Sequence, residues 1–208
     1  MQVEDLFDLL LIKFGHQNWW PGETLPEIIV GAILTQNTNW KNVEKSIDNL
    51  RKHDLIDFSA ILKTGTDELA QLIYSSGYYN QKAERLKKVA EYFVNSNDLG
   101  NLETTKFREQ LLSINGIGPE TADSILLYAF ERPVFVIDAY TKRIGQRLGF
   151  WNEKISYEEA QKYFQDRLIS DEKIFNEFHA LLVKLGKDFC RKKPLCSKCY
   201  IKNECNKL

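Results

Sequence analysis

The sequence lacks several features that would point to particular classes of protein. It has no apolar run long enough to cross a membrane. Its first residues, MQVEDLFDLLLIKFGHQ, are amphipathic and carry acids, so they do not read as a secretory signal. We find no internal repeat and no low-complexity run. These absences lead us to expect a cytoplasmic protein with no membrane partner.

An overall excess of positive charge, which is typical of many nucleic-acid-binding proteins, is absent too. The 208 residues carry a net charge of −1, but residues 184–208 carry +6 and leave the rest at −7. A local basic face suits a DNA-binding surface, although the same residues could form a solvated tail that balances an acidic body. With 43% hydrophobic residues, the chain can build a substantial core, as one large domain or two small ones.

Cysteine does not occur before residue 190. The four cysteines of the chain then follow within sixteen residues as C-x5-C-x2-C-x5-C: Cys190, Cys196, Cys199 and Cys205. Thiolates this close in sequence can surround one metal centre, and disulfides are not expected in a reducing compartment. The spacing alone leaves both zinc and an iron–sulfur cluster open.

Helical periodicity dominates the chain, so we expect an all-α protein. The one β-like piece is the apolar run at residues 133–137, and residues 96–103 read as a polar connector. The predicted helices cover residues 2–14, 25–34, 40–52, 55–62, 66–74, 80–95, a segment that ends near 113, a segment that begins at 119, 139–148, 156–169 and 173–189.

The most informative stretch is LLSINGIGPETADSILLYAFERPVFVID, residues 111–138. Asn115-Gly116-Ile117-Gly118 reads as a tight turn between two helices, because glycine adopts positive φ without steric cost. Pro119 suits the first position of the second helix. Exposed backbone N–H groups at such a turn could hold a DNA phosphate, but a plain αα-hairpin is the ordinary interpretation.

Residues 114–122, INGIGPETA, together with Val136-Ile137-Asp138, resemble the helix-hairpin-helix and catalytic aspartate of the endonuclease III superfamily of DNA glycosylases. The resemblance implies an all-α, two-domain enzyme with a cleft between its domains. We expect a six-helix domain at residues 22–131, with the helix-hairpin-helix at about 107–130. The second helical domain would combine residues 1–21 and 132–208. Asn115, Gly116, Ile117 and Gly118 would then contact DNA.

A narrower resemblance links the chain to the 3-methyladenine DNA glycosylase III group. It rests on the LTQNT run, on SGYYNQKA and on four residues that would line the base pocket: Trp19, Trp20, Pro21 and Trp40. Lys187 aligns loosely with a pocket lysine of that group, and Gln36 matches the residue that enters the gap left by an extruded base. Without the resemblance, the tryptophans would be packing residues and Gln36 a helix-capping amide.

Two carboxylates carry the expected chemistry. Asp138 alone reads as a helix N-cap, but in the family this residue also stabilises the positive charge that builds on the sugar and orients the attacking water. Glu120 stands where bifunctional members of the family have a lysine, which forms a Schiff base and cuts the strand. A carboxylate cannot do so, although by itself Glu120 is only a first-turn acid. We therefore expect base removal without AP-lyase activity.

The cysteine loop, residues 190–205, resembles the loop that holds a [4Fe–4S] cluster in many endonuclease III relatives, although their first gap is usually one residue longer. We therefore expect a [4Fe–4S] cluster rather than zinc, in a structural role. It would hold a loop whose basic residues, Arg191, Lys192, Lys193 and Lys198, meet DNA phosphates.

We see no general acid for a neutral leaving base, since all three histidines lie outside the motifs. An alkylated purine such as 3-methyladenine is already cationic and would stack on electron-rich rings. We thus expect a monomeric, cytoplasmic and nucleoid-associated glycosylase that hydrolyses the N-glycosidic bond of a flipped alkylated purine in double-stranded DNA. One alternative is a glycosylase of the same fold for oxidised or mismatched pyrimidines. Another is a non-catalytic damage-binding iron–sulfur protein.

Overall fold

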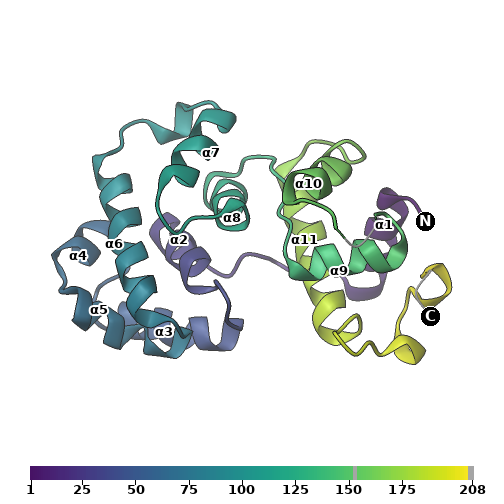
Figure 1. The fold of residues 1–208 in the computed structure, drawn as a ribbon, viewed down its shortest axis with the longest axis horizontal. Helices are drawn as coiled ribbons and strands as arrows, with labels where there is room; N and C mark the ends of the chain where they lie inside the picture. Colours follow the sequence, from purple (N-terminus) through teal and green to yellow (C-terminus); the bar gives the residue numbers. More distant parts are fainter. Residues whose placement is uncertain (152–153, 206–208) are drawn as a thin grey trace. The chain divides into compact units, whose positions relative to one another are not determined.

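The computed structural model describes residues 1–151 and 154–205. Within these ranges the chain forms eleven α-helices and no β-strand, which confirms the predicted all-α class. The chain divides into two compact units. We call residues 21–130 the central unit and residues 1–20 with 131–208 the terminal unit (Figure 1).

The central unit contains the seven α-helices that the periodicity predicts, one more than the six that the resemblance implies; the short α4 and α5 are separated by extended backbone at Thr64 and Gly65. Thr66 is the first residue of α5, and Gly65 is its N-cap. The helices are α2 (Leu25–Leu34), α3 (Trp40–Lys52), α4 (Phe58–Lys63), α5 (Thr66–Leu72), α6 (Tyr79–Asn95), α7 (Thr104–Ser113) and α8 (Pro119–Phe130).

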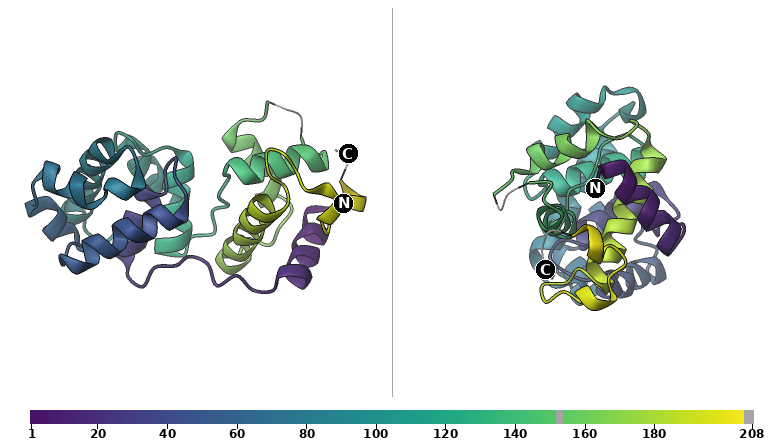
Figure 2. Two further views of the ribbon diagram at one scale, coloured as in Figure 1. Left: turned by 90° about the horizontal axis from the view of Figure 1, so that it is seen from below. Right: turned by 90° about the vertical axis from the view of Figure 1, so that its right-hand side faces the viewer.

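Helix α2 lies at the centre of this unit. Every residue from Ile29 to Leu34 is buried, and the helix contacts α3, α6 and α8. Helices α4 and α5 pack against α6, while α7 packs against α8 (Figures 1 and 2). A helix that is apolar on nearly every side must be covered on every side. Residues of α6 and α8 therefore pack around α2.

The terminal unit joins the two ends of the chain. Helix α1 (Val3–Phe14) lies beside α11 (Glu172–Asp188), which also contacts α9 (Ala139–Leu148) (Figure 2). Helix α10 (Tyr157–Gln165) ends four residues before the predicted end, because Asp166 begins a turn that is closed by bonds to Lys162 and Phe164 carbonyls. The core is aromatic: stacked Phe135 and Phe164 (ring centroids 4.4 Å apart), with Phe175 and Phe178 edge-on.

Residues 133–137 do not form a strand. Val134 to Ile137 are buried, and side chains of α10 bond to the backbone of Phe135 and Ile137. The Phe135 N–H donates to Gln165 Oε1 (2.8 Å), while the Phe135 carbonyl accepts from Gln161 Nε2 (2.7 Å). A buried peptide must find hydrogen-bond partners, and here side chains replace a neighbouring strand.

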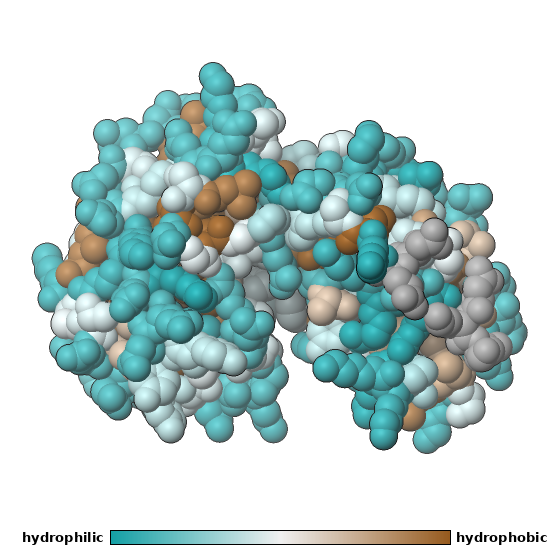
Figure 3. Space-filling view, in the orientation of Figure 1, coloured by the Kyte–Doolittle hydropathy of each residue, from teal (hydrophilic) through white to brown (hydrophobic). Residues whose placement is uncertain are grey.

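No helix among the described residues is long and apolar enough to cross a membrane. Figure 3 shows that hydrophilic residues cover most of the visible face of each unit. Side-chain caps begin most of the helices, because their first N–H groups lack partners within the helix. The capping residues that accept a backbone N–H are Thr24, Asn39, Asp57, Glu103, Asp138, Ser156 and Asp171.

Candidate functional site

A five-residue turn, residues 114–118, joins α7 to α8. Asn115, Gly116 and Gly118 are exposed, whereas Ile117 is buried and anchors the turn in the core. Gly116 has a φ of 95°, in the left-handed region that favours glycine. Pro119 is the first residue of α8, where its missing N–H costs nothing. The turn therefore presents exposed backbone at a helix start, the arrangement that suits an anion such as a phosphate.

An ion pair holds the two helices of this hairpin together. Arg108 on α7 donates from Nε to Asp123 Oδ1 (2.6 Å) and from Nη2 to Oδ2 (3.1 Å). Asp123 on α8 is completely buried, and the arginine is only partly exposed. A two-point contact between planar groups fixes orientation as well as distance, so the angle between α7 and α8 is set from inside the unit.

Gln36 lies directly after α2, in the same unit as the hairpin, and its side chain reaches the hairpin. Its Nε2 donates to Thr121 Oγ1 (2.9 Å) and to the Gly116 carbonyl (3.2 Å). Its Oε1 accepts from Arg85 Nη1 (2.6 Å). The structure thus brings together the end of α2, the middle of α6 and the start of α8, although their sequence separations reach 85 residues.

Glu120 is the second residue of α8 and is exposed. Its backbone carbonyl accepts from Ser124 Oγ (2.7 Å), one turn further along the helix. An acid in the first turn is favoured by the partial positive charge of the helix start. The carboxylate therefore stands at the helix start, immediately after the hairpin.

Asp138 begins α9 in the terminal unit and is half-buried. Its Oδ1 accepts the Thr141 N–H at 2.7 Å, so this residue is indeed a helix N-cap. Its Oδ2 lies 3.9 Å from Nε2 of the buried His179 on α11. Burial lowers the pKa of His179, and the charge of Asp138 opposes that shift. The neutral form of His179 is thereby favoured, and the Asp138 carboxylate is held at the N-terminal end of α9.

His179 is the residue that sequence reasoning missed. The histidines fall outside the motifs, yet His179 on α11 lies beside Asp138 at the start of α9. The available signal was its position on α11 among Phe178, Ala180 and Leu181, all of them buried. A histidine on the buried face of a helix must meet a polar partner or remain neutral.

The expected base-pocket residues fall into two groups. In the terminal unit, the half-buried rings of Trp19 and Trp20 are edge-to-face, 5.5 Å apart, and Lys187 Nζ lies 5.7 Å from the centre of the Trp19 ring. In the central unit, Pro21 and Trp40 line a surface pocket. Its other lining residues are largely charged: Gly22, Glu23, Glu27, Glu44, Ile47, Asp48 and Arg51.

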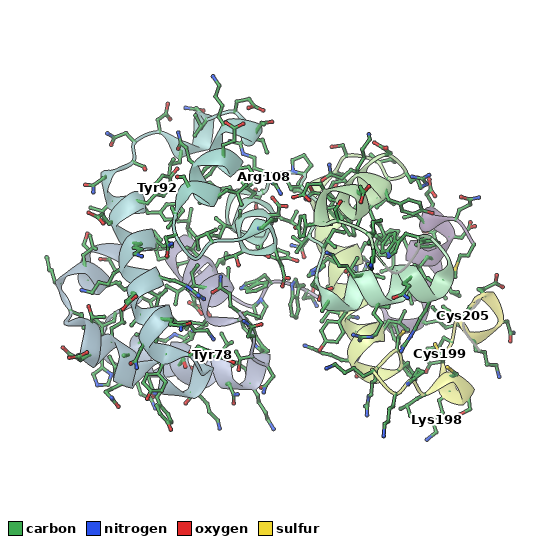
Figure 4. All side chains as sticks on the ribbon, in the orientation of Figure 1. Tyr78, Tyr92, Arg108, Lys198, Cys199 and Cys205 are labelled. Atoms are coloured by element: carbon green, nitrogen blue, oxygen red, sulfur yellow. The ribbon has the colours of Figure 1, made fainter. Side chains whose placement is uncertain are left out.

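All four cysteines lie in the segment after α11 and line one pocket. Figure 4 labels two of them, Cys199 and Cys205. Burial and the neighbouring cysteines raise the pKa of Cys199. Among the described residues, no three or more Cys, His, Asp or Glu side chains are arranged closely enough to hold a metal ion. A shared pocket lined by four soft donors nevertheless fits a tetrahedral thiolate centre in its chemistry.

Two arginines of α9 hold the start of this cysteine loop. Arg143 Nε donates to the Cys190 carbonyl (2.7 Å), and Arg147 Nη1 donates to the Arg191 carbonyl (2.7 Å) and to Cys190 Sγ (3.2 Å). The predicted phosphate-contacting residues that follow are exposed: Arg191, Lys192, Lys193 and Lys198. A surface pocket beside them is lined by Ala139, Tyr140, Arg143, Gly186, Lys187, Arg191 and Lys192, a strongly positive set.

Residues 30–168 match the family model described as "HhH-GPD superfamily base excision DNA repair protein". The chain belongs to the HhH-GPD superfamily. A protein of Methanocaldococcus jannaschii named as a candidate DNA repair glycosylase is 51% identical over 98% of this chain and 95% of its own length. Endonuclease III of Sulfolobus acidocaldarius is 33% identical over 85% of the chain and 79% of its own length.

Solved structures of the HhH-GPD superfamily share the fold. A trapped endonuclease III–DNA covalent intermediate superimposes with a TM-score of 0.85 at 22% identity, covering 98% of this chain and 94% of that one. The H. pylori 3-methyladenine DNA glycosylase MagIII, bound to 1,N6-ethenoadenine, gives 0.76 at 28% identity, covering 90% and 98%. The protein is thus a DNA-binding DNA glycosylase of base excision repair, and the endonuclease III-like fold is confirmed.

Proposed function

We propose that this HhH-GPD protein is a monofunctional DNA glycosylase that hydrolyses the N-glycosidic bond of a flipped alkylated purine. The observation that carries the proposal is the pair of carboxylates at two helix starts, Asp138 capping α9 and Glu120 in the first turn of α8. A carboxylate can assist hydrolysis but cannot form an imine with the sugar. The chemistry therefore ends at an abasic site with an intact strand.

Asp138 would act through charge and position. The Thr141 N–H donates to Oδ1 and so fixes the carboxylate at the N-terminal end of α9. As the glycosidic bond breaks, positive charge develops on the sugar, and a fixed anion stabilises it more strongly than it stabilises the ground state. The same carboxylate can accept a hydrogen bond from the attacking water and so direct it.

The aromatic residues and the local charges favour a cationic base as substrate. A positively charged purine stacks on an indole more strongly than a neutral one does. The Trp40 pocket is lined by four carboxylates and one arginine, a balance that attracts a cation. Lys187 already lies over Trp19, so we expect the cationic base to contact Trp20 or Trp40 instead. The likeness to MagIII in complex with an ethenoadenine supports a damaged purine.

We propose that Cys190, Cys196, Cys199 and Cys205 hold a [4Fe–4S] cluster, with zinc as the alternative. The group would supply four metal–thiolate bonds that tie together a segment with little core of its own. Arg147, which donates to Cys190 Sγ, and the carbonyl contacts of Arg143 orient the start of the loop. Arg191, Lys192 and Lys193 would then be held where phosphates can meet them.

The deciding experiment incubates the purified protein with duplex DNA methylated by an alkylating agent. We expect free 3-methyladenine to be released, and strand breaks to form only after alkali. Borohydride should trap no covalent complex on an abasic site. Release of no methylated base would reject the substrate class, and nicking without alkali or a borohydride-trapped complex would reject the monofunctional chemistry.

A second candidate function is favoured by the relatives named endonuclease III, one of which covers 85% of the chain at 33% identity. Under this alternative the substrate is an oxidised or mismatched pyrimidine. A panel of single-lesion duplexes separates the two, because an alkylpurine enzyme releases base only from the alkylated member. A damage-binding protein without catalysis would release no base from any of them.

A further inference from the structure

Gln36 is expected to fill a gap in DNA, yet in this structure its side-chain amide is hydrogen-bonded within the central unit. Its two N–H groups have two acceptors, Thr121 Oγ1 and the Gly116 carbonyl, and its carbonyl has one donor, Arg85. Only one orientation of the amide fits these partners, since an arginine can only donate and a backbone carbonyl can only accept.

Arg85 is itself held against the hairpin. A Cβ added at Gly116 would lie 2.5 Å from Arg85 Nε and 2.8 Å from its Cδ, so the arginine occupies the space that the glycine leaves. Its bond to Gln36 Oε1, at 2.6 Å, is a charge-assisted hydrogen bond, the stronger kind. The α6 arginine thus packs on the hairpin and fixes the Gln36 amide at the same time.

We propose that Thr121 and Arg85 are positioning residues that hold Gln36 in a stowed conformation, and that release from these contacts is a step in binding DNA with a missing or extruded base. The proposal rests on the proposed role of Gln36 in filling that gap. Entry into a base stack requires the amide to exchange its protein partners for DNA or water. Weakening the stowed state therefore favours insertion, because a two-state equilibrium shifts by the free energy taken from one side.

The cleanest test is Thr121→Val, which keeps the shape of the side chain, removes the hydroxyl acceptor and changes no charge. Dissociation constants are measured by fluorescence anisotropy on an intact duplex and on the same duplex with an abasic-site analogue. We expect Thr121→Val to bind the abasic duplex about three- to tenfold more tightly, the size of one net hydrogen bond. Binding to the intact duplex should stay the same, because it has no gap to fill.

Ser124→Ala is the matched control. Ser124 lies on the same helix, is buried to the same degree and loses a hydroxyl that bonds to the Glu120 carbonyl rather than to Gln36. It should change neither dissociation constant. A 2-aminopurine opposite the abasic analogue supplies a spectroscopic signal, since its fluorescence responds to a side chain that enters the gap. That signal should change at a lower protein concentration with Thr121→Val.

Arg85→Met provides a second route in case Thr121→Val folds poorly. Its control is Lys88→Met, which removes the same charge from the same helix; the exposed Lys88 also reaches the hairpin, but at Asn115 Oδ1 (3.3 Å) rather than at Gln36. Both should weaken binding to the intact duplex equally, while on the abasic duplex Arg85→Met should bind several times more tightly than Lys88→Met. Arg85→Lys, which retains a donor, should restore part of the wild-type behaviour.

Gln36→Ala separates the failure of this inference from the failure of the role on which it rests. If Gln36→Ala leaves abasic-duplex binding unchanged, Gln36 does not fill the gap and both ideas fall. If Gln36→Ala weakens that binding but Thr121→Val and Arg85→Met fail to tighten it relative to their controls, stowing alone is wrong. In a Gln36→Ala background, Thr121→Val should have no effect, as a double-mutant cycle requires of residues that act through one side chain.

Discussion

The hairpin of the central unit and the cysteine loop of the terminal unit are both expected to meet DNA, yet they are built in different ways. The hairpin stands between two helices that a buried ion pair clamps together, and Ile117 anchors its turn in the core. In the cysteine loop, residues 191–195 are all exposed, and regular structure is limited to the short turns Cys196–Lys198 and Lys202–Glu204. Apolar burial is thus available to the hairpin but largely not to the loop.

This difference shows how the same requirement, a fixed surface for phosphates, has two physical solutions. Side-chain packing and hydrogen bonds suffice where helices flank the turn. In the described part of the chain, the cysteine loop has no such flanking pair of helices. Two arginines of α9 orient its first residues, and its four thiols line one pocket, where a bound metal centre would hold the rest of the loop together. We therefore expect the central unit to be indifferent to metal and the cysteine loop to depend on it.

The largest expected effect separates the two units by chemistry. Asp138→Asn should lower base release about a thousandfold or more, because the charge that stabilises the transition state is lost. Asparagine still caps a helix, so folding and DNA affinity should be retained. Single-turnover kinetics measures the rate of base release, and fluorescence anisotropy measures DNA affinity. Full activity in Asp138→Asn would contradict the assignment.

In the central unit, Glu120→Lys should instead introduce an amine that borohydride traps covalently on abasic DNA.

The ion pair of the hairpin gives the next largest effect. Asp123→Asn should destabilise the protein by about 3 kcal/mol, since it breaks a pair whose carboxylate is completely buried. Urea unfolding followed by circular dichroism measures the loss. Asp48→Asn is the control: its pair with Arg51 is exposed on both sides, so its loss should cost less than about 0.5 kcal/mol. Equal losses in the two variants would show that the buried Arg108–Asp123 pair stabilises the protein no more than an exposed pair does.

Lys82 adds a pH dependence to the central unit. Its ammonium is completely buried, donates to the Leu34 and Ser76 carbonyls, and has a pKa lowered to about 8, chiefly by desolvation. Between pH 8 and about 10.5 the unfolded chain holds this proton more firmly, so the contribution of Lys82 to folding should rise with pH. The free energy of unfolding of the wild type, minus that of Lys82→Met, should therefore increase by up to about 3 kcal/mol as the pH rises across that range. A flat difference would contradict the lowered pKa.

The smallest expected effect tests the loop. Cys199→Ser should abolish metal binding, seen as loss of absorption near 400 nm, and weaken DNA binding about tenfold at moderate salt as the basic residues lose their fixed positions. The central unit should keep its unfolding transition. A loss of DNA binding as large as that caused by disrupting the hairpin would break the comparison, because the loop would then carry the main contact.

The sequence by itself determined the helices, the hairpin and the candidate carboxylates, because each depends on local rules. Gly116 and Pro119 mark the hairpin through backbone geometry, and Asp138 marks the start of α9 through capping. Tertiary structure alone decided the partners. The three contacts of Gln36 and the approach of His179 to Asp138 join segments tens of residues apart, and no local pattern encodes which buried surfaces will meet. Packing of the apolar faces brings those segments together, and the polar groups carried with them must then satisfy one another.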